Sequence, residues 1–179
     1  MVTVCLRVPT AEDAEPLAAL LTRNRAYFRT GEPLRPDGFY TPKHQGRVLA
    51  DAQSGRESGT GFMFLIEHDG ALAGRASVSS VIRGAFQSGS VGYVVDEAQT
   101  GKGVATAALR GLIDVAFGDL NLHRLQGETL LDNVASERVL QTCGFVYYGT
   151  APDYLRVDGR WQTNNLYQLI NDSWTGLTR

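Results

Sequence analysis

Hydrophobic and polar positions in the first third of the chain predict one strand, two helices and two loops. Residues 2–8 alternate apolar and polar side chains, which is typical of a strand. Leucines then recur at helical spacing behind a capping box formed by Thr10 and Asp13. Glycines, prolines and aromatic residues are interleaved in the following loop, whose rings either pack onto the core or line a cleft. The expected elements are a strand over 2–8, a helix from Thr10 to about Arg25, a loop over 27–40, a short helix over 42–52 and a polar loop over 53–61.

From residue 62 onward the pattern is that of a sheet with covering helices. Three apolar runs are separated by turn signals, and the Asp69-Gly70 pair is typical of a hairpin. One later segment carries apolar residues on one helical face, as expected of a helix that covers a sheet, and another helix is expected to start at Asn133 and to end at Gly144, a residue suited to a helix C-terminus. The expected strands lie over 62–67, 72–82, 90–95, 122–130, 145–149 and 164–170, the helices over 103–117 and 133–144, and a loop with an Asp-Gly turn over 150–163. This order predicts a mixed α/β fold, with residues 1–179 forming a single domain.

Composition narrows the class of protein. The chain has 179 residues, 43% of them hydrophobic and 20% charged, and its formal net charge is −2. These values are typical of a soluble globular protein and argue against direct nucleic-acid or membrane binding. Cys5 and Cys143 are too few for a disulfide framework, and they have no metal-ligand spacing to the three histidines. The N-terminus lacks a signal-peptide core, and no apolar run approaches the roughly 18–20 residues of a membrane span, so we expect a cytoplasmic protein without a metal.

The segment Gln99-Thr-Gly-Lys-Gly-Val-Ala-Thr106 joins a predicted strand to a predicted helix and has the character of a phosphate-binding loop. Glycines allow the tight turn, and backbone N–H groups at a helix N-terminus attract anions. The P-loop pattern fails, because Asp96 stands where its first glycine belongs and Gly103 follows Lys102. The dinucleotide pattern fits poorly, since Thr106 takes the place of its third glycine. A connection that binds no ligand is the alternative.

A third pattern, a Gln/Arg-x-x-Gly-x-Gly/Ala arch, places Gly103 at its centre and Ala105 at its end, although Thr100 stands where glutamine or arginine is usual and Gln99 comes one position early. Other signals follow in a fixed order: Gly92-Tyr93 before the arch, then Asn133-Val-Ala-Ser136, then Cys143-Gly144-Phe145. With these motifs the chain resembles the GCN5-related N-acetyltransferase (GNAT) family, and in particular its RimJ/RimL branch of ribosomal-protein N-acetyltransferases. Most of the chain takes part in the resemblance.

The resemblance implies a GNAT fold, in which a mixed, mostly antiparallel sheet of about seven strands is flanked by about four helices. It also implies acetyl-CoA as cosubstrate, with the pyrophosphate on the arch and the acetyl carbonyl on backbone N–H groups of the preceding strand. Arg138 either reaches a phosphate or is solvated. The residues that the resemblance assigns to the coenzyme are Val94, Val95, Thr100, Gly101, Lys102, Gly103, Val104, Ala105, Thr106, Asn133 and Arg138.

Two residues are candidates for catalysis. From the sequence alone, Ser136 stands at the third position of a helix that Asn133 caps. By resemblance, it is a proton donor to the coenzyme sulfur or orients a water there. Glu128 is the candidate base, because it lies on the strand that leads to Asn133. An α-amine, with a pKa of about 7.7–8.0, needs less help from a base than a lysine at about 10.4, so the absence of a stronger base favours an α-amine acceptor.

Aromatic and arginine side chains from three expected loops are candidates to grip an extended peptide, or else they pack those loops onto the core. These residues are Arg25, Phe28, Tyr40, Arg83, Phe86, Tyr154 and Trp161. The leading hypothesis is acetylation of a protein or peptide N-terminus, with a ribosomal protein as candidate partner, by a monomer or homodimer. The alternatives are acetylation of a small-molecule amine such as an antibiotic, and a non-catalytic module that binds acetyl-CoA.

Overall fold

A seven-stranded mixed sheet forms the centre of the computed structural model, which describes residues 3–176. The spatial order of the strands is β1-β2-β3-β4-β5-β7-β6, and neighbouring strands run antiparallel except β4 and β5, which are parallel. The strands are β1 (Val4–Arg7), β2 (Phe62–His68), β3 (Ala71–Ile82), β4 (Ser88–Val95), β5 (Arg124–Leu130), β6 (Val146–Val157) and β7 (Arg160–Ile170). The predicted fold class is therefore confirmed, with one parallel pair in an otherwise antiparallel sheet.

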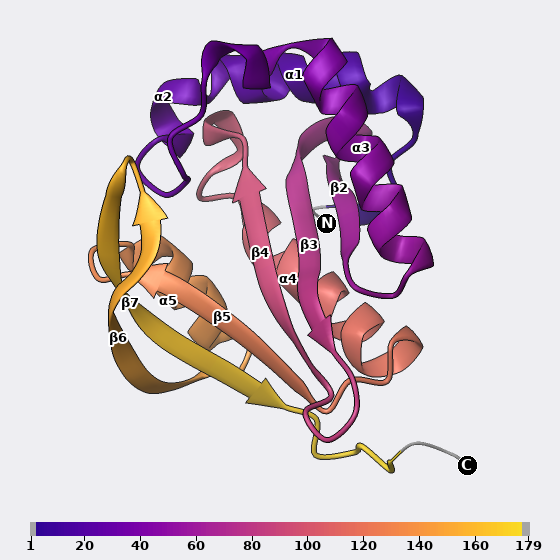
Figure 1. Cartoon of the computed structure of the whole chain (residues 1–179), viewed down its shortest axis with the longest axis vertical. Coiled ribbons are helices and arrows are strands. Elements are labelled where there is room, and N and C mark those ends of the chain that lie inside the picture. The colour runs from indigo at the N-terminus through magenta and orange to yellow at the C-terminus, as the bar shows by residue number, and fades with distance from the viewer. Residues whose placement is uncertain (1–2, 177–179) are drawn as a thin grey trace.

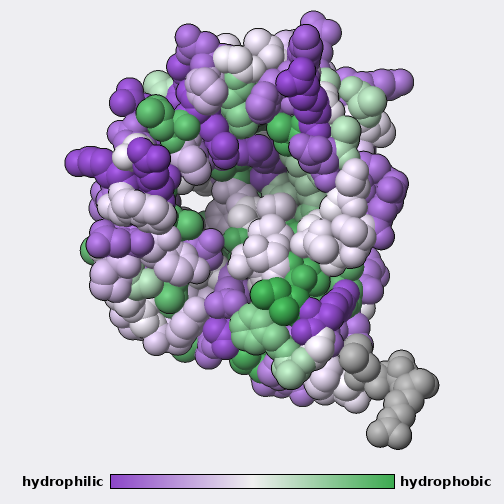
Figure 2. All heavy atoms as spheres, in the orientation of Figure 1, coloured by the Kyte–Doolittle hydropathy of each residue, from purple (hydrophilic) through white to green (hydrophobic). Residues whose placement is uncertain are grey.

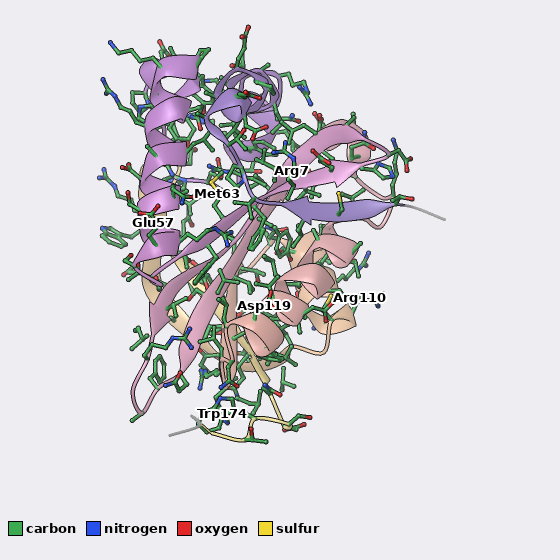
Figure 3. All side chains as sticks on the ribbon, turned by 90° about the vertical axis from the view of Figure 1, so that its right-hand side faces the viewer. Arg7, Glu57, Met63, Arg110, Asp119 and Trp174 are labelled. Carbon is green, nitrogen blue, oxygen red and sulfur yellow. The ribbon has the colours of Figure 1, made fainter. Side chains whose placement is uncertain are left out.

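Helices cover both faces of this sheet (Figures 1 and 3). They are α1 (Ala14–Arg23), α2 (Arg25–Phe28), α3 (Pro42–Glu57), α4 (Val104–Asp114) and α5 (Val134–Thr142). In the edge-on view of Figure 3, α3 with Glu57 at its end lies on one side of the sheet, and α4 with Arg110 lies on the other. The chain continues from α4 into a π-helical turn, Val115–Asp119.

Strand β2 shows why two layers of helices are needed, because its side chains are buried on both faces. Leu65 is fully buried in a cluster with residues of α1 and α3, and the adjacent Ile66 is fully buried in a cluster with residues of α4. Successive strand residues point to opposite faces, so an almost uninterrupted apolar run is what such a strand requires. The leucines at helical spacing in the first predicted helix, Leu17, Leu20 and Leu21, all belong to the first cluster.

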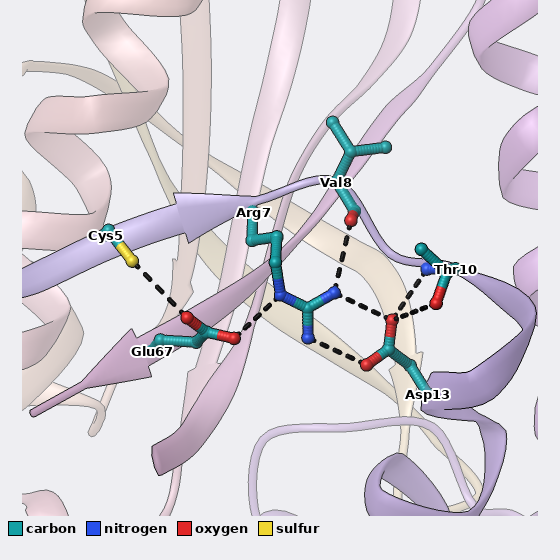
Figure 4. Close-up of polar contacts among 6 residues, drawn as sticks. All are labelled: Cys5, Arg7, Val8, Thr10, Asp13 and Glu67. Atoms are coloured by element: carbon teal, nitrogen blue, oxygen red, sulfur yellow. Dashed lines mark hydrogen bonds and ion pairs between the residues drawn. The ribbon is translucent and has the colours of Figure 1, made fainter. Parts of the chain in front are cut away.

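A polar network fixes β1, β2 and the start of α1 to one another (Figure 4). Arg7 Nε donates to Glu67 Oε1 at 2.7 Å, and Arg7 Nη2 donates to Asp13 Oδ1 at 2.8 Å. Asp13 also accepts from the backbone N–H of Thr10 at 2.6 Å, which confirms the predicted capping box. The Arg7 guanidinium, followed by the hydrogen bonds from Thr10, lowers the pKa of Asp13 to about 2.

Three expected loops contain regular structure. Helix α3 continues through residue 57, so the predicted polar loop over 53–61 is wrong at its start; its helical turns are polar and carry no apolar periodicity. The expected loop over 27–40 holds the second half of α2 and a 3₁₀ turn, Asp37–Tyr40. The expected loop over 150–163 is a hairpin in which β6 and β7 extend to a turn at Asp158 and Gly159. Strand β6 is mostly exposed, which removes the apolar alternation that reveals a strand.

Candidate active site

The parallel strands β4 and β5 separate halfway along their length. They pair only from Ser88 opposite Arg124 to Ser90 opposite Gln126, whereas β3 stays paired with β4 as far as Val95. Figure 1 shows the two strands spreading apart beyond this point. The edge of β4 that faces β5 is therefore without a strand partner from about Val91 onward. Unpaired backbone groups on such an edge are free to bind an extended ligand.

The ladder with β3 determines which backbone groups of β4 face this gap. The Asp96 N–H donates to the Ala73 carbonyl at 2.8 Å, in register with the β3–β4 ladder. Hydrogen-bonded and non-hydrogen-bonded pairs alternate in an antiparallel ladder. The backbone N–H of Val94 is therefore directed at β3, whereas the backbone N–H groups of Tyr93 and Val95 are directed at the gap. Of the two N–H groups expected to face a ligand, this register favours that of Val95, with that of Tyr93 beside it, over that of Val94. The Val94 residue still lines both cavities.

The predicted arch lies at the end of β4 and opens helix α4. Gly101 has φ +74° and Gly103 has φ +78°, both in the left-handed region where side chains are unfavourable. Gly103 is also the N-cap of α4 and offers no side chain to the first turn, so the N–H groups there are available to an anion. Lys102 is exposed, and its ammonium donates to Gln99 Oε1 at 3.1 Å.

Two cavities meet at the gap. The larger cavity, of about 630 Å³, extends from α2 across the arch to the start of α5. Every residue predicted to bind the coenzyme lines it except Lys102. The smaller cavity, of about 440 Å³, lies between β3, β4, β5 and the β6–β7 hairpin. Figure 2 shows that the surface is hollowed in this region. The residues that line both cavities are Gly31, Glu32, Tyr93, Val94, Leu130, Asn133 and Ser136.

Ser136 lies at the junction of the two cavities and is held there twice. Its backbone N–H donates to Asn133 Oδ1 at 3.1 Å, which confirms Asn133 as the cap of α5. Its hydroxyl Oγ is 3.0 Å from the phenol oxygen of Tyr93, on the opposite wall. Burial raises the pKa of Tyr93 to about 12 and outweighs the opposing effect of this hydrogen bond. Tyr93 is therefore a protonated phenol in the neutral pH range.

Glu128 lines the smaller cavity from β5, as Ser136 does from α5. Burial raises the pKa of its carboxyl, and within residues 3–176 no hydrogen bond or ion pair to its side chain is present to oppose that effect. The pKa of Tyr154 is raised by burial and then by the negative charge of Glu128. Asn164, on β7, lines the same cavity and has a buried Oδ1 without a hydrogen-bond partner. A half-buried carboxyl without a partner in the described residues is suited to take a proton from a ligand.

An ion pair that the sequence analysis did not single out fixes one wall of both cavities. Glu32 Oε1 and Arg75 Nη2 are 2.6 Å apart, and their side chains are 17% and 19% exposed. The Glu32 carbonyl also accepts from the N–H of Asp158, whose carboxylate pairs with Arg29 at 2.8 Å. The segment after α2 is thereby attached both to β3 and to the β6–β7 turn. No sequence signal connects residues so far apart.

The seven residues predicted to grip an acceptor are not gathered in one place, and none of them lines the smaller cavity. Arg25 lies over the Tyr40 ring at 4.6 Å from its centroid and pairs with Asp37. Phe28 is buried and lines the larger cavity. Tyr154 and Trp161 belong to strands β6 and β7 instead of a loop.

The remaining two of these seven, Arg83 and Phe86, lie at the β3–β4 turn, which is at the opposite end of β4 from the arch. Arg83 donates to the Leu120 carbonyl at 2.6 Å, and the Phe86 ring lies by Arg124 at 5.9 Å from its centroid. The seven were grouped by residue type, and strand topology separates them.

Residues 3–176 contain neither a metal-binding cluster nor a membrane-spanning helix. The part of the chain that the structure describes holds no group of three or more His, Cys, Asp or Glu side chains arranged to hold a metal ion. Among its helices, none combines the length and the apolar character required to cross a membrane.

Comparison with known proteins identifies the family. Residues 3–146 match the model of the acetyltransferase (GNAT) domain. The chain is 33% identical to the probable N-acetyltransferase YjcK of Bacillus subtilis, over 94% of each chain. It superimposes with a TM-score of 0.92 on the ribosomal-protein-S5-alanine acetyltransferase of Vibrio fischeri, at 31% identity over 98% of this chain and 100% of that one. It superimposes equally well, with a TM-score of 0.92, on Mycobacterium smegmatis RimJ in complex with CoA-disulfide, at 27% identity over 97% of this chain and 84% of that one. The chain belongs to the GNAT family and is an acetyl-CoA-dependent N-acetyltransferase of the RimJ/RimL type.

Proposed function

We propose that this enzyme acetylates the N-terminal α-amine of a protein, with a ribosomal protein as the candidate acceptor, and that residues 1–179 form one N-acetyltransferase domain. The observation that carries the proposal is the meeting of two cavities at the free edge of β4. One cavity is lined by the glycine arch and the other by the half-buried Glu128 carboxyl. An amine entering from one side then faces a thioester held from the other.

The larger cavity is the coenzyme site in this proposal. Acetyl-CoA supplies an activated acetyl group as a thioester. The backbone N–H groups of the arch and of the first turn of α4 bind its pyrophosphate, and Arg138 adds a positive charge at the rim. The N–H groups of Tyr93 and Val95 bind along the free edge of β4, where one of them stabilises the oxyanion. Fixed backbone donors of this kind contribute about 3 kcal/mol to an acyl transfer.

Glu128 is the base, and Ser136 is the hydrogen-bond donor to the leaving sulfur. Glu128 takes a proton from the acceptor amine, directly or through a water, as the nitrogen forms its bond to the acetyl carbon and the carbon–sulfur bond breaks. Ser136, which lines the same cavity, donates a hydrogen bond to the departing sulfur, which leaves as a thiolate and takes its proton from water. Burial moves the pKa of Glu128 upward, toward that of an α-amine, which makes the proton transfer more nearly balanced.

The size and chemistry of the smaller cavity support a terminal amine as acceptor. At about 440 Å³ it accommodates the first residues of a chain, and it carries Glu128 and the free amide oxygen of Asn164 as hydrogen-bond acceptors. The relative from Vibrio fischeri is described as an acetyltransferase of ribosomal-protein-S5 alanine. A ribosomal substrate would place the enzyme in the cytoplasm.

A product screen tests the proposal. The enzyme is incubated with acetyl-CoA and either peptides that begin with Ala or Ser or a panel of small amines, including aminoglycosides and polyamines, and products are identified by mass spectrometry. Acetylation of the peptide α-amine is expected. A preference for small amines would assign the enzyme to the small-molecule class instead. Binding of acetyl-CoA without turnover on any amine would indicate a non-catalytic module.

A further inference from the structure

Tyr93 and Ser136 meet across the junction of the two cavities, although they are 43 residues apart and belong to β4 and α5. The phenol oxygen of Tyr93 is 3.0 Å from Ser136 Oγ, a contact in which either hydroxyl can be the donor, and the Tyr93 hydroxyl also has the Ser136 carbonyl oxygen as an acceptor at 3.3 Å. Both residues line both cavities. The pair thus stands where the ligands of the two cavities meet.

The two hydroxyl groups differ in freedom. The Tyr93 ring packs against the hydrophobic cluster under α4 and α5, so its hydroxyl has a fixed position. A serine side chain in the first turn of a helix can rotate and can direct its proton to a nearby backbone carbonyl. With such a rotation Ser136 would have no proton to offer to a ligand. The contact with the Tyr93 hydroxyl limits this rotation of the Ser136 side chain.

We propose that Tyr93 is a positioning residue, whose hydroxyl donates to Ser136 Oγ and thereby directs the Ser136 proton into the junction, toward the sulfur of the coenzyme. This inference rests on the proposed role of Ser136 in acetyl transfer. Each hydroxyl has one proton to donate, and the Tyr93 proton has two acceptors, Ser136 Oγ at 3.0 Å and the Ser136 carbonyl oxygen at 3.3 Å. Oγ is the nearer of the two, and a donor on Oγ leaves the serine proton free for a ligand. Tyr93 suits the task because burial keeps it protonated in the neutral range.

The first test compares Tyr93→Phe with Tyr147→Phe in steady-state kinetics. Tyr147 is a matched control, because its hydroxyl is 2.7 Å from Thr150 Oγ1 on the exposed β6 strand and lies outside both cavities. The hydrogen bond from Tyr93 to Ser136 Oγ should strengthen in the transition state, when Ser136 faces the charge that develops on the sulfur. Its loss in Tyr93→Phe should therefore lower kcat about tenfold. KM for acetyl-CoA should stay within about twofold. The control should match the wild type.

A double-mutant cycle then tests whether Tyr93 acts through Ser136. Once Ser136→Ala has removed the hydroxyl, adding Tyr93→Phe should cause no further loss of kcat. Independent, multiplicative losses in the double variant would overturn the proposal. So would a Tyr93→Phe enzyme with the kcat of the wild type.

A titration of bound coenzyme A tests the geometry without turnover. The thiolate of bound CoA is followed by its ultraviolet absorbance as the pH is raised. A hydrogen-bond donor stabilises the charged form and lowers the pKa of the thiol, so that pKa should be higher in Tyr93→Phe and in Ser136→Ala than in the wild type. The charged groups of the two cavities, Glu32, Arg75, Glu128, Asp132 and Arg138, are the same in all three proteins.

Ser136→Ala leaves the tyrosine ring in place, so it keeps the titration decisive if Tyr93→Phe fails to fold. An unchanged thiol pKa in Ser136→Ala would overturn the proposal. A wild-type enzyme that binds CoA but acetylates no amine would refute the proposed function instead, while the titration still reports on the Tyr93–Ser136 contact.

Discussion

Ser90 on β4 and Gln126 on β5 form the last pair before the two parallel strands separate. Past this pair, β4 remains paired with β3 on one side only. The free side is where the larger and smaller cavities meet. One interruption in the sheet therefore supplies backbone donors and opens the space in which a ligand can reach them.

Backbone hydrogen exchange should show the alternation along β4. In the free protein, the amide protons of Tyr93 and Val95 should exchange faster than those of Gly92 and Val94, because only the latter two are in hydrogen-bonded pairs with β3. Acetyl-CoA should slow the exchange of Tyr93 and Val95 selectively. Residue-resolved exchange by NMR checks this, and equal protection of all four amides in the free protein would contradict the free edge.

Glu128→Gln should reduce activity and increase stability together. Removing a general base typically lowers kcat by about 10²–10⁴-fold. The folded-state pKa of Glu128 is raised by burial, so its contribution to stability is present at low pH and is lost as the pH rises through that pKa. At neutral pH the neutral glutamine should therefore raise Tm, and the gain should vanish in acid.

The exposed Glu12 provides the control for this change. Glu12→Gln should leave both kcat and Tm near their wild-type values. A Glu128→Gln enzyme that is fully active would remove Glu128 from the mechanism, whatever its Tm.

Gly103→Ala should weaken coenzyme binding. An alanine at φ +78° is strained by about 1–2 kcal/mol, and relief of that strain would move the N–H groups of the arch. We expect about a tenfold rise in the Kd for CoA, measured by calorimetry. Gly38→Ala is the matched control, because a Cβ there meets no atom within 4 Å and its backbone is outside the left-handed region. Equal affinity in both variants would argue against an arch that binds the pyrophosphate.

Asp13→Asn should destabilise the protein in a pH-dependent way. The pKa of Asp13 is lowered to about 2, so its contribution is present at neutral pH and is lost as the pH falls toward that value. The loss at pH 7 should be about 1–2 kcal/mol in urea denaturation, and it should shrink in acid. Asp37→Asn, which removes an exposed ion pair with Arg25, should cost less than about 0.5 kcal/mol. A loss at Asp13 that does not depend on pH would exclude the ionic origin.

Local patterns in the sequence were sufficient to predict much of the secondary structure, the glycine arch and the helix caps of this protein. Apolar periodicity predicted α1, α4 and most of the strands, since a buried face imposes its period on the residues that form it. The glycines of the arch were recognisable because positive φ at Gly101 and Gly103 demands glycine. Asn133 as a cap and the capping box at Thr10 were visible because both involve residues three apart.

Only the tertiary structure decided the contacts between distant segments. It determined that the backbone N–H of Tyr93, and not that of Val94, faces the gap, because the direction of each N–H depends on the ladder with β3. It brought Tyr93 to Ser136 and Glu32 to Arg75, and it placed Arg83 and Phe86 far from the arch. A sequence records the period of each element, which is local, whereas the register and divergence of strands result from packing across the whole sheet. The residues of the arch were therefore predictable from the sequence, whereas the arrangement of the side chains that line the two cavities was not.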